Sequence, residues 1–402
     1  MNALPFLTAN HAGIGGRIKV KPEDFVVEEI PLYAPSGAGQ HVYACLEKRG
    51  LSTPQAVSAV ARALGVPTGV IGYAGLKDAR AITRQVISID GVQPAQVEAL
   101  DLPGIQILWV NRHRNKLKTG HLAGNRFTLR VRDVSQDILP AAEAVLDELR
   151  RRGVPNYFGE QRFGGRGNTH LLGAALLRGD AQAFLSEYLG QPQPHERADA
   201  QTARSAFDAG DYAAALAQWP PSLRDERRVL AALARHGNAE AGIEAALRAL
   251  DRKLRSLFVS AYQSHLFNHL LAHRIQTLDQ LQLGDVAFIH ASGAAFVVQD
   301  AALEQPRADR FEISPSGPLF GPKSLLAEGV PGQQERAALE ESGLSLAEFR
   351  LPGLKFKGAR RPFRIPLADG QVGWDDGLML NFRLPPGSYA TEVLREVMKT
   401  GQ

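Results

Sequence analysis

The feature that most constrains the fold of this 402-residue chain is a change of pattern along its length. Residues 180–272 are rich in alanine and carry apolar residues at helical spacing, whereas the segments on either side contain short runs of alternating apolar and polar residues. A period of 3.6 residues is typical of amphipathic helices, and a period of two is typical of half-buried strands. We therefore predict a helix-rich region between two strand-rich ends, in a chain long enough for about two domains.

The helical pattern is most regular near the end of the alanine-rich region. One predicted helix face contains Leu247, Leu250, Leu254, Leu257 and Ala261. The segment GQPQPHERADAQ at 190–201 has the composition of a surface loop. No repeat of 20 to 50 residues is evident, so a solenoid is not expected.

Three alternating runs predict strands in the two ends of the chain. These are residues 18–30, NRFTLRV at 125–131 and LMLNFRL at 378–384, the last followed by a predicted helix in ATEVLREVMK. By strand parity Asn125 shares a face with Phe127, and Phe382 shares one with its apolar neighbours. A polar amide that leads an otherwise apolar face suggests a strand end that opens into a pocket.

A single aspartate, Asp78, stands in the segment GYAGLKDARAITRQ at 72–85. Upstream, Thr53 followed by proline predicts a helix N-cap, and Gly65 predicts the end of that helix. The apolar runs VIGYAG and RQVISI predict strands on either side of Asp78, which places it on a strand-end loop. Such a carboxylate can act as a nucleophile if nearby cations keep it ionised, or it can simply form a turn. Its local sequence alone favours the turn.

Composition excludes several classes of protein. Cys45 is the only cysteine, which rules out internal disulfides and cysteine-based zinc sites. No run approaches the roughly 20 apolar residues of a membrane span, and the first residues lack a secretory signal, so we expect a cytoplasmic protein without membrane contact. His265 and His269 have metal-ligand spacing on a predicted helix, but packing is the favoured reading. The usual nucleotide, hydrolase and metalloprotease motifs are missing, so we expect neither metal nor cofactor.

Basic residues are unevenly distributed, although the formal charge is only +4. The stretch at 111–132 carries seven Lys and Arg residues and no acid, and the stretch at 355–364 carries five more with two phenylalanines among them. Cations interleaved with aromatic rings can neutralise phosphates and stack on unpaired bases. Both stretches are therefore candidate RNA-binding segments, and a solvated surface face is the alternative.

Five ordered motifs carry a family resemblance. They are KPEDFVVEE at 21–29, GLKDARAITRQ at 75–85, NRHRNKLKTGHLAGNRFTL at 111–129, VPNYFGEQRFGGRGN at 154–168 and FRLPPGSYATEVLRE at 382–396. Together they run over nearly the whole chain, and the chain resembles the tRNA pseudouridine synthase D (TruD) family. The resemblance implies an α+β fold in which both chain ends, 1–153 and 354–402, form a pseudouridine synthase catalytic domain with a mixed, largely antiparallel sheet. A helix-rich α/β TRUD domain is then inserted at 154–353.

The resemblance also implies an activity and a site. The family isomerises uridine 13 in the D-arm of tRNA to pseudouridine, and Asp78 matches its catalytic aspartate. Phe25, Asn125 and Phe382 match positions that contact the target nucleotide or line its pocket.

Other site residues are less firmly placed. Phe127 is equally a stacking platform or a core residue, because it lies in an alternating strand. Lys19, Lys21 and Lys77 are candidates for the cation that orients Asp78, and Lys21 is ranked first because Lys77 would need a kinked turn. A monomer without cofactor that binds tRNA is expected. The alternatives are an RNA-binding module or tRNA folding chaperone without catalysis, and, less favoured, a nucleoside hydrolase-like enzyme.

Overall fold

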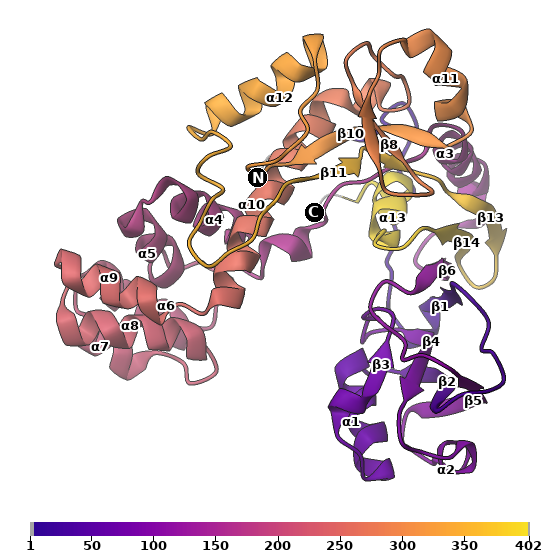
Figure 1. Ribbon diagram of the computed structural model, residues 1–402, viewed down its shortest axis with the longest axis horizontal. Coiled ribbons are helices and arrows are strands. Elements are labelled where there is room, and N and C mark those ends of the chain that lie inside the picture. The colour runs from indigo at the N-terminus through magenta and orange to yellow at the C-terminus, as the bar shows by residue number, and fades with distance from the viewer. Residues whose placement is uncertain (1–3, 401–402) are drawn as a thin grey trace. The chain divides into compact units, whose positions relative to one another are not determined.

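The computed structural model describes residues 4–400 and divides into two compact units (Figure 1). The terminal unit comprises residues 6–156 and 364–400, and the middle unit comprises 157–363 with Leu4 and Pro5. The sequence places these boundaries three and ten residues earlier, after 153 and 353. They shift because β7 (Val154–Pro155) pairs with β12 (Arg364–Ile365) in the terminal unit, whereas β11 (Ala359–Pro362) pairs with a strand of the middle unit.

The terminal unit is built on one mixed sheet of eight strands. Its order is β13-β14-β6-β1-β4-β2-β5, with β3 also beside β4; β1 and β4 are parallel and the other pairs are antiparallel. The strands are β1 (Phe25–Pro31), β2 (His41–Arg49), β3 (Ile71–Tyr73), β4 (Ile82–Ile89), β5 (Ile105–His113), β6 (Leu122–Val131), β13 (Ala368–Trp374) and β14 (Leu378–Leu384). The helices are α1 (Thr53–Leu64), α2 (Pro94–Glu98), α3 (Leu139–Arg152) and α13 (Ala390–Met398).

The two chain ends share this sheet because β14 pairs with β6 in register, with Phe382 opposite Phe127. On the other half of the sheet, α1 packs its apolar face against β2 and β4 in a core that includes Val60, Leu46 and Ile87. The predicted α+β class with a mixed sheet formed from both ends is therefore confirmed. Within residues 4–400, none of the helices combines the length and the apolar character needed to cross a bilayer.

The middle unit combines a set of helices with a small antiparallel sheet of order β11-β10-β8-β9. The strands that precede β11 are β8 (Val286–Ile289), β9 (Ala295–Val297) and β10 (Ile313–Leu319). The helices are α4 (Thr169–Arg178), α5 (Ala181–Leu189), α6 (Ala198–Asp208), α7 (Tyr212–Gln218), α8 (Arg224–His236), α9 (Glu240–Ala249), α10 (Arg252–Arg274), α11 (Ala301–Asp309) and α12 (Gly329–Glu341). The helical region predicted from the alanine-rich segment is present as α5 to α10.

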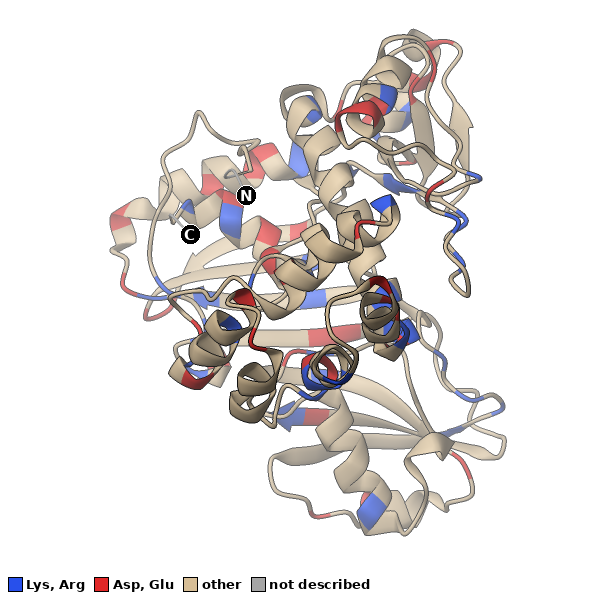
Figure 2. Ribbon diagram, turned by 90° about the vertical axis from the view of Figure 1, so that its left-hand side faces the viewer, with Lys and Arg blue, Asp and Glu red and all other residues tan. Residues whose placement is uncertain are grey.

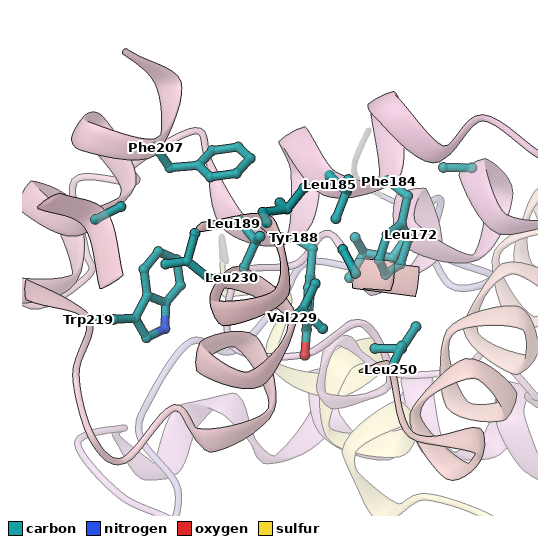
Figure 3. Packing of buried hydrophobic residues seen from close by; sticks show 14 of the residues in the cluster. Leu172, Phe184, Leu185, Tyr188, Leu189, Phe207, Trp219, Val229, Leu230 and Leu250 are labelled. Atoms are coloured by element: carbon teal, nitrogen blue, oxygen red, sulfur yellow. The ribbon is translucent and has the colours of Figure 1, made fainter. Parts of the chain in front are cut away.

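Helices α4 to α10 enclose a hydrophobic cluster centred on buried aromatic and leucine side chains (Figure 3). Trp219 lies at one side of this cluster and Phe184 at the other, and Leu230 of α8 lies in it, fully buried. The prediction of one continuous helix face is wrong, because the helix is interrupted between Leu250 and Lys253. Asp251 caps the start of α10 there. In addition, Leu257 is 43% exposed, although its spacing placed it on the buried face.

Two predicted element starts also differ. Ser52, not Thr53, caps α1, because its side chain forms a capping box with Gln55, while Gly65 ends the helix in the left-handed region as expected. The strand predicted for 18–30 begins only at Phe25, because residues 22–24 form a short 3₁₀ turn before it. That turn matters for the candidate site.

We expect Leu230→Ala to destabilise the middle unit by about 2–5 kcal/mol, because it removes a fully buried side chain from the helical cluster. Urea unfolding followed by Trp219 fluorescence measures the free energy of unfolding of this unit. The other two tryptophans are replaced in this experiment, by Trp109→Phe and Trp374→Phe. Leu257→Ala is the matched control and should change the free energy of unfolding by less than about 0.5 kcal/mol. Equal effects of the two substitutions would contradict the packing described.

Candidate active site

Asp78 lies on the loop between β3 and β4, and its carboxylate is ion-paired with Lys19 Nζ. The backbone N–H of Arg80 donates to the other carboxylate oxygen at 3.0 Å. Lys19 Nζ also lies 4.3 Å from the centroid of the Phe25 ring, within the range of a cation–π contact. The pair thus joins the aspartate loop to the first residue of β1.

Lys19 reaches Asp78 because of an unusual backbone conformation. Its φ is +56°, in the left-handed region that residues with a side chain seldom adopt. The adjoining turn is fixed by Asp24, which is buried, accepts from the Lys21 N–H at 2.8 Å and pairs with Arg132 at 2.7 Å. The structure therefore corrects the ranking made from sequence: Lys19, not Lys21, is the cation paired with Asp78. Lys21, at the start of the turn at 22–24, is exposed instead.

The pKa of Asp78 is lowered from its ordinary value by a balance of opposing effects. Partial burial is the largest influence and by itself would raise the pKa. The hydrogen bond and the positive charge of Lys19, together with the Arg80 N–H, outweigh it. Asp78 is consequently ionised at neutral pH, as a nucleophile or a base must be.

Phe25, Phe127 and Phe382 form one aromatic cluster across three neighbouring strands. The Phe25 and Phe127 ring centroids lie 6.5 Å apart in an edge-to-face arrangement, and the Phe127 and Phe382 centroids lie 5.4 Å apart. The three residues are 4%, 6% and 1% exposed. The structure thus brings all three predicted aromatic residues together, beside the Lys19–Asp78 pair. Phe127 connects the other two as part of the core, and a role in contacting a base stays a prediction for each ring.

Asn125 lies on the same face of β6 as Phe127, as parity predicts, opposite Glu29 of β1 and Leu384 of β14. The residue is 9% exposed, and within the described part of the chain its side-chain Oδ1 has no hydrogen-bond partner. A buried acceptor without a partner is costly unless a ligand or water satisfies it. An amide at this position can accept from the N3–H of a uracil and donate to a carbonyl of the same base.

Two lysines, Lys48 of β2 and Lys77 of the loop itself, fix the position of the Asp78 loop. Lys48 of β2 is completely buried, and its Nζ donates to the backbone carbonyl of Asp78 at 3.0 Å and to that of Leu51. Burial lowers the pKa of Lys48 to about 8, against an opposing effect of Asp78. Lys77 pairs instead with the buried Glu29 at 2.8 Å and so does not orient Asp78. Sequence reasoning missed both Lys48 and Glu29, although Lys48 shares a strand face with the apolar Leu46.

Of the two glycines before Asp78, only Gly72 is required sterically. A Cβ atom built on Gly72 would lie 2.2 Å from the carbonyl oxygen of Leu117, so the chain approaches the segment before β6 too closely for any side chain. A Cβ on Gly75 would meet only Lys77 Nζ, at 3.6 Å, and the Gly75 backbone is not left-handed. Only the close approach at Gly72 therefore requires a residue without a side chain.

The two basic stretches differ in what they offer to RNA. In the stretch at 355–364, Arg360 is buried in an ion pair with Glu335 at 2.8 Å, and Arg364 is buried and donates to the Arg152 carbonyl at 2.8 Å. These two guanidinium groups cannot reach phosphates, contrary to the sequence interpretation. Lys355 and Lys357 remain exposed.

In the stretch at 111–132, the last residues serve the fold and the first ones face solvent. Arg130 and Arg132 both pair with acidic side chains, including Asp24. Arg114 and Lys118 are exposed. Elsewhere on the sheet, Lys and Arg are interleaved with Asp and Glu along the strands (Figure 2), as where Arg84 pairs with Glu28 and Glu47.

His265, considered above as a metal ligand, packs in the middle unit. Its ring stacks on that of His170 with centroids 4.5 Å apart, and burial lowers the pKa of both imidazoles. His269 lies 3.7 Å from Glu341. Among residues 4–400 there is no group of three or more His, Cys, Asp or Glu that could hold a metal ion.

The mixed eight-stranded sheet thus carries an ionised carboxylate beside an aromatic cluster. Comparisons with known proteins identify the family of the chain. The profile of tRNA pseudouridine synthase D (TruD) matches residues 3–397. A tRNA pseudouridine synthase D of Geobacter metallireducens is 50% identical over 399 residues, which are 99% of this chain and 98% of that protein. The corresponding protein of Geotalea daltonii is 49% identical over 398 residues, which cover 98% and 100% of the two chains.

A solved structure agrees with these matches. A crystal structure from Methanosarcina mazei, described as a tRNA pseudouridine synthase D, has a TM-score of 0.86 and 30% sequence identity, and the match covers 99% of this chain and 96% of that one. The chain therefore belongs to the tRNA pseudouridine synthase D (TruD) family.

Replacing Lys19 by Met should raise the pKa of Asp78, because the effect of burial would then be opposed only by the backbone donors. In the parent the carboxylate stays ionised as pH falls to below its ordinary pKa of 3.8, so the midpoint should move to higher pH in Lys19→Met. ¹³C NMR of carboxyl-labelled aspartate, assigned with Asp78→Asn, measures the midpoint. Lys19→Arg keeps the charge and is the matched control. A midpoint in Lys19→Met equal to that of the parent would show that Lys19 does not set this pKa.

Replacing Lys48 by Met should change how stability depends on pH. In the parent, Lys48 titrates near pH 8 when folded and near 10.5 when unfolded, so the unfolded state binds more protons between these values and stability rises with pH. Lys48→Met lacks this rise. Urea unfolding at pH 7.5 and 9.5 should show the parent gaining about 1–2 kcal/mol relative to the variant, whereas Lys118→Met, at an exposed lysine, should follow the parent. Parallel pH dependence in parent and Lys48→Met would mean that the Lys48 pKa is ordinary.

Proposed function

We propose that this chain is a tRNA pseudouridine synthase that converts uridine 13 of the D-arm to pseudouridine, with Asp78 as its catalytic carboxylate. Family membership supports the coarse activity, the isomerisation of uridine in tRNA. The observation that carries the assignment of Asp78 is its ion pair with Lys19 beside the aromatic cluster. The terminal unit is then the catalytic domain, and the middle unit is the inserted TRUD domain. The enzyme acts as a cytoplasmic monomer without a cofactor.

The reaction rearranges bonds without adding atoms. The N1–C1′ glycosidic bond breaks, the uracil turns, a C5–C1′ bond forms, and the proton on C5 is lost while N1 gains one. Asp78 either attacks C1′ and forms a covalent adduct or assists loss of the C2′ proton toward a glycal intermediate. Both routes need an ionised carboxylate, and the lowered pKa of Asp78 provides one.

Binding must hold a base that has left its stack, at a cost of a few kcal/mol. Stacking on an aromatic ring offsets this by about 1–3 kcal/mol per base. We assign this role to Phe25 or Phe382, which pack on either side of Phe127. Asn125, with its unsatisfied Oδ1, can distinguish uracil from cytosine, because cytosine lacks the N3–H donor. Lys21 is exposed near β1 and can contact a phosphate of the bound strand.

Asp78→Asn should retain tRNA binding but lower pseudouridine formation at position 13 by more than about 10³-fold, because the amide is neither nucleophile nor base. Carbodiimide primer extension on a tRNA transcript reads the product, and filter binding reads affinity. Asp101→Asn, at an exposed aspartate of the same unit, is the matched control and should remain fully active. Parent-like activity of Asp78→Asn would exclude the catalytic role.

Release of tritium from 5-tritiated uridine in tRNA separates this proposal from an RNA-binding module or folding chaperone, because binding alone cannot break the C5–H bond. Binding without tritium release in the parent would favour the chaperone. Modification at a uridine other than 13 would keep the enzyme class and overturn the position.

A further inference from the structure

The terminal unit contains two adjoining cavities away from the aromatic cluster, of about 340 and 700 Å³. Both are lined by Tyr33, Ala34 and His121, in the segments that follow β1 and precede β6. The smaller cavity is mainly apolar, and its lining includes Leu117 and Trp109. Trp109 is 38% exposed. Exposed aromatic and aliphatic groups around a cavity are a common sign of a binding site.

The larger cavity is polar and basic. It is lined by His41, His113, Lys116 and Lys118, and none of its lining residues is an acid. His41 is 8% exposed, and its Nδ1 has no hydrogen-bond partner among the described residues, with the Asp90 carboxylate 3.9 Å away. A buried imidazole nitrogen left unsatisfied at a basic cavity indicates a missing polar ligand.

Tyr33 stands between the two cavities in a fixed orientation. Its ring stacks on that of His113, with centroids 5.2 Å apart and planes at 18°, and its hydroxyl is 2.9 Å from His121 Nδ1. The Ser36 N–H donates to His113 Nδ1 at 3.1 Å, which holds that ring in place. Because these contacts already order Tyr33, a planar ligand that stacks on it loses little further side-chain entropy.

Two strand residues of the smaller cavity lie on the other face of the sheet from Lys48. Tyr43 and Val86 line the smaller cavity, and by strand alternation they project away from the face that carries Lys48. Glu29 also lines the smaller cavity, and its carboxylate pairs with Lys77, the residue before Asp78. The segments are also linked, because the Gly120 N–H donates to the Ala74 carbonyl at 2.8 Å, four residues before Asp78.

We propose that the two cavities bind a second, unpaired nucleotide of the substrate tRNA, distinct from the target uridine. Its base lies in the apolar cavity against Tyr33 and Trp109, and its phosphate lies in the basic cavity near Lys116 and Lys118. An apolar, aromatic compartment beside a cationic one without acids complements a nucleotide, and single-stranded RNA is recognised in this way. The inference rests on the proposed function, because it takes tRNA as the substrate.

Single-turnover pseudouridine formation on a tRNA transcript, with the full chain in increasing excess, tests the proposal. Tyr33→Leu removes the stacking ring and should raise the half-saturating enzyme concentration about 5- to 150-fold, whereas Tyr33→Phe keeps the ring and should stay within about threefold of the parent. Lys118→Gln should raise that concentration and reduce the slope of log affinity against log salt by about 1. Arg62→Gln, at an exposed arginine of α1, is the matched charge control.

The outcomes separate this inference from the proposed function. Unchanged half-saturation for Tyr33→Leu and Lys118→Gln, with normal product at position 13, would overturn the second nucleotide site alone. Equal losses for Tyr33→Phe and Tyr33→Leu would also overturn it, because the base would not be stacking on the ring. Zero-length ultraviolet crosslinking of parent enzyme and tRNA should join Tyr33 or Trp109 to a nucleotide other than residue 13. A crosslink from these residues to residue 13 would contradict the separation of the two sites. Absence of any product in the parent would instead reject the proposed function.

Discussion

The contact between Lys19 and Asp78 is the interaction on which the candidate site depends. It opposes the effect of burial on the carboxylate and keeps it ionised. Lys19 makes it from a left-handed backbone conformation, which a β-carbon disfavours. The turn that follows Lys19 is held by the buried Asp24, which pairs with Arg132, directly after β6. The charge state of one loop residue is thus set through a turn and a strand that lie far from it in sequence.

The large sheet explains why both ends of the chain are needed. Phe25 comes from β1, Phe127 from β6 and Phe382 from β14, so the aromatic cluster exists only when the last strands pair with the first ones. The middle unit can be inserted without disturbing this pairing, because β7 and β12 lie side by side where the chain leaves and returns. A long insertion is then compatible with a rigid site.

Sequence pattern predicted the elements that depend on local chemistry, and it failed where distant contacts decide. Strand parity placed Asn125 and Phe127 on one face, and the ordered motifs pointed to Phe25 and Phe382, which lie beside them. The ranking of Lys21 over Lys19 failed because the sequence pattern does not reveal the left-handed backbone at Lys19 or the 3₁₀ turn at 22–24. The helix break at Asp251 was overlooked, although an aspartate before a polar first turn is a cap signal. Lys48 was missed because a buried amine is rare and its partners are backbone carbonyls, which carry no sequence signal.

Several groups around the site are held in arrangements that cost stability. Lys48 is charged yet buried, Asn125 leaves an acceptor unsatisfied, and Lys19 has a strained backbone. Each costs on the order of 1–3 kcal/mol where nothing compensates it. Such costs gather where a structure fixes groups in advance for a ligand, because a site relaxed without its ligand must reorganise to bind it. The unsatisfied His41 at the larger of the two cavities shares this property. An unsatisfied buried polar atom supports a bound uracil at Asn125, and by the same reasoning it supports a second nucleotide at His41.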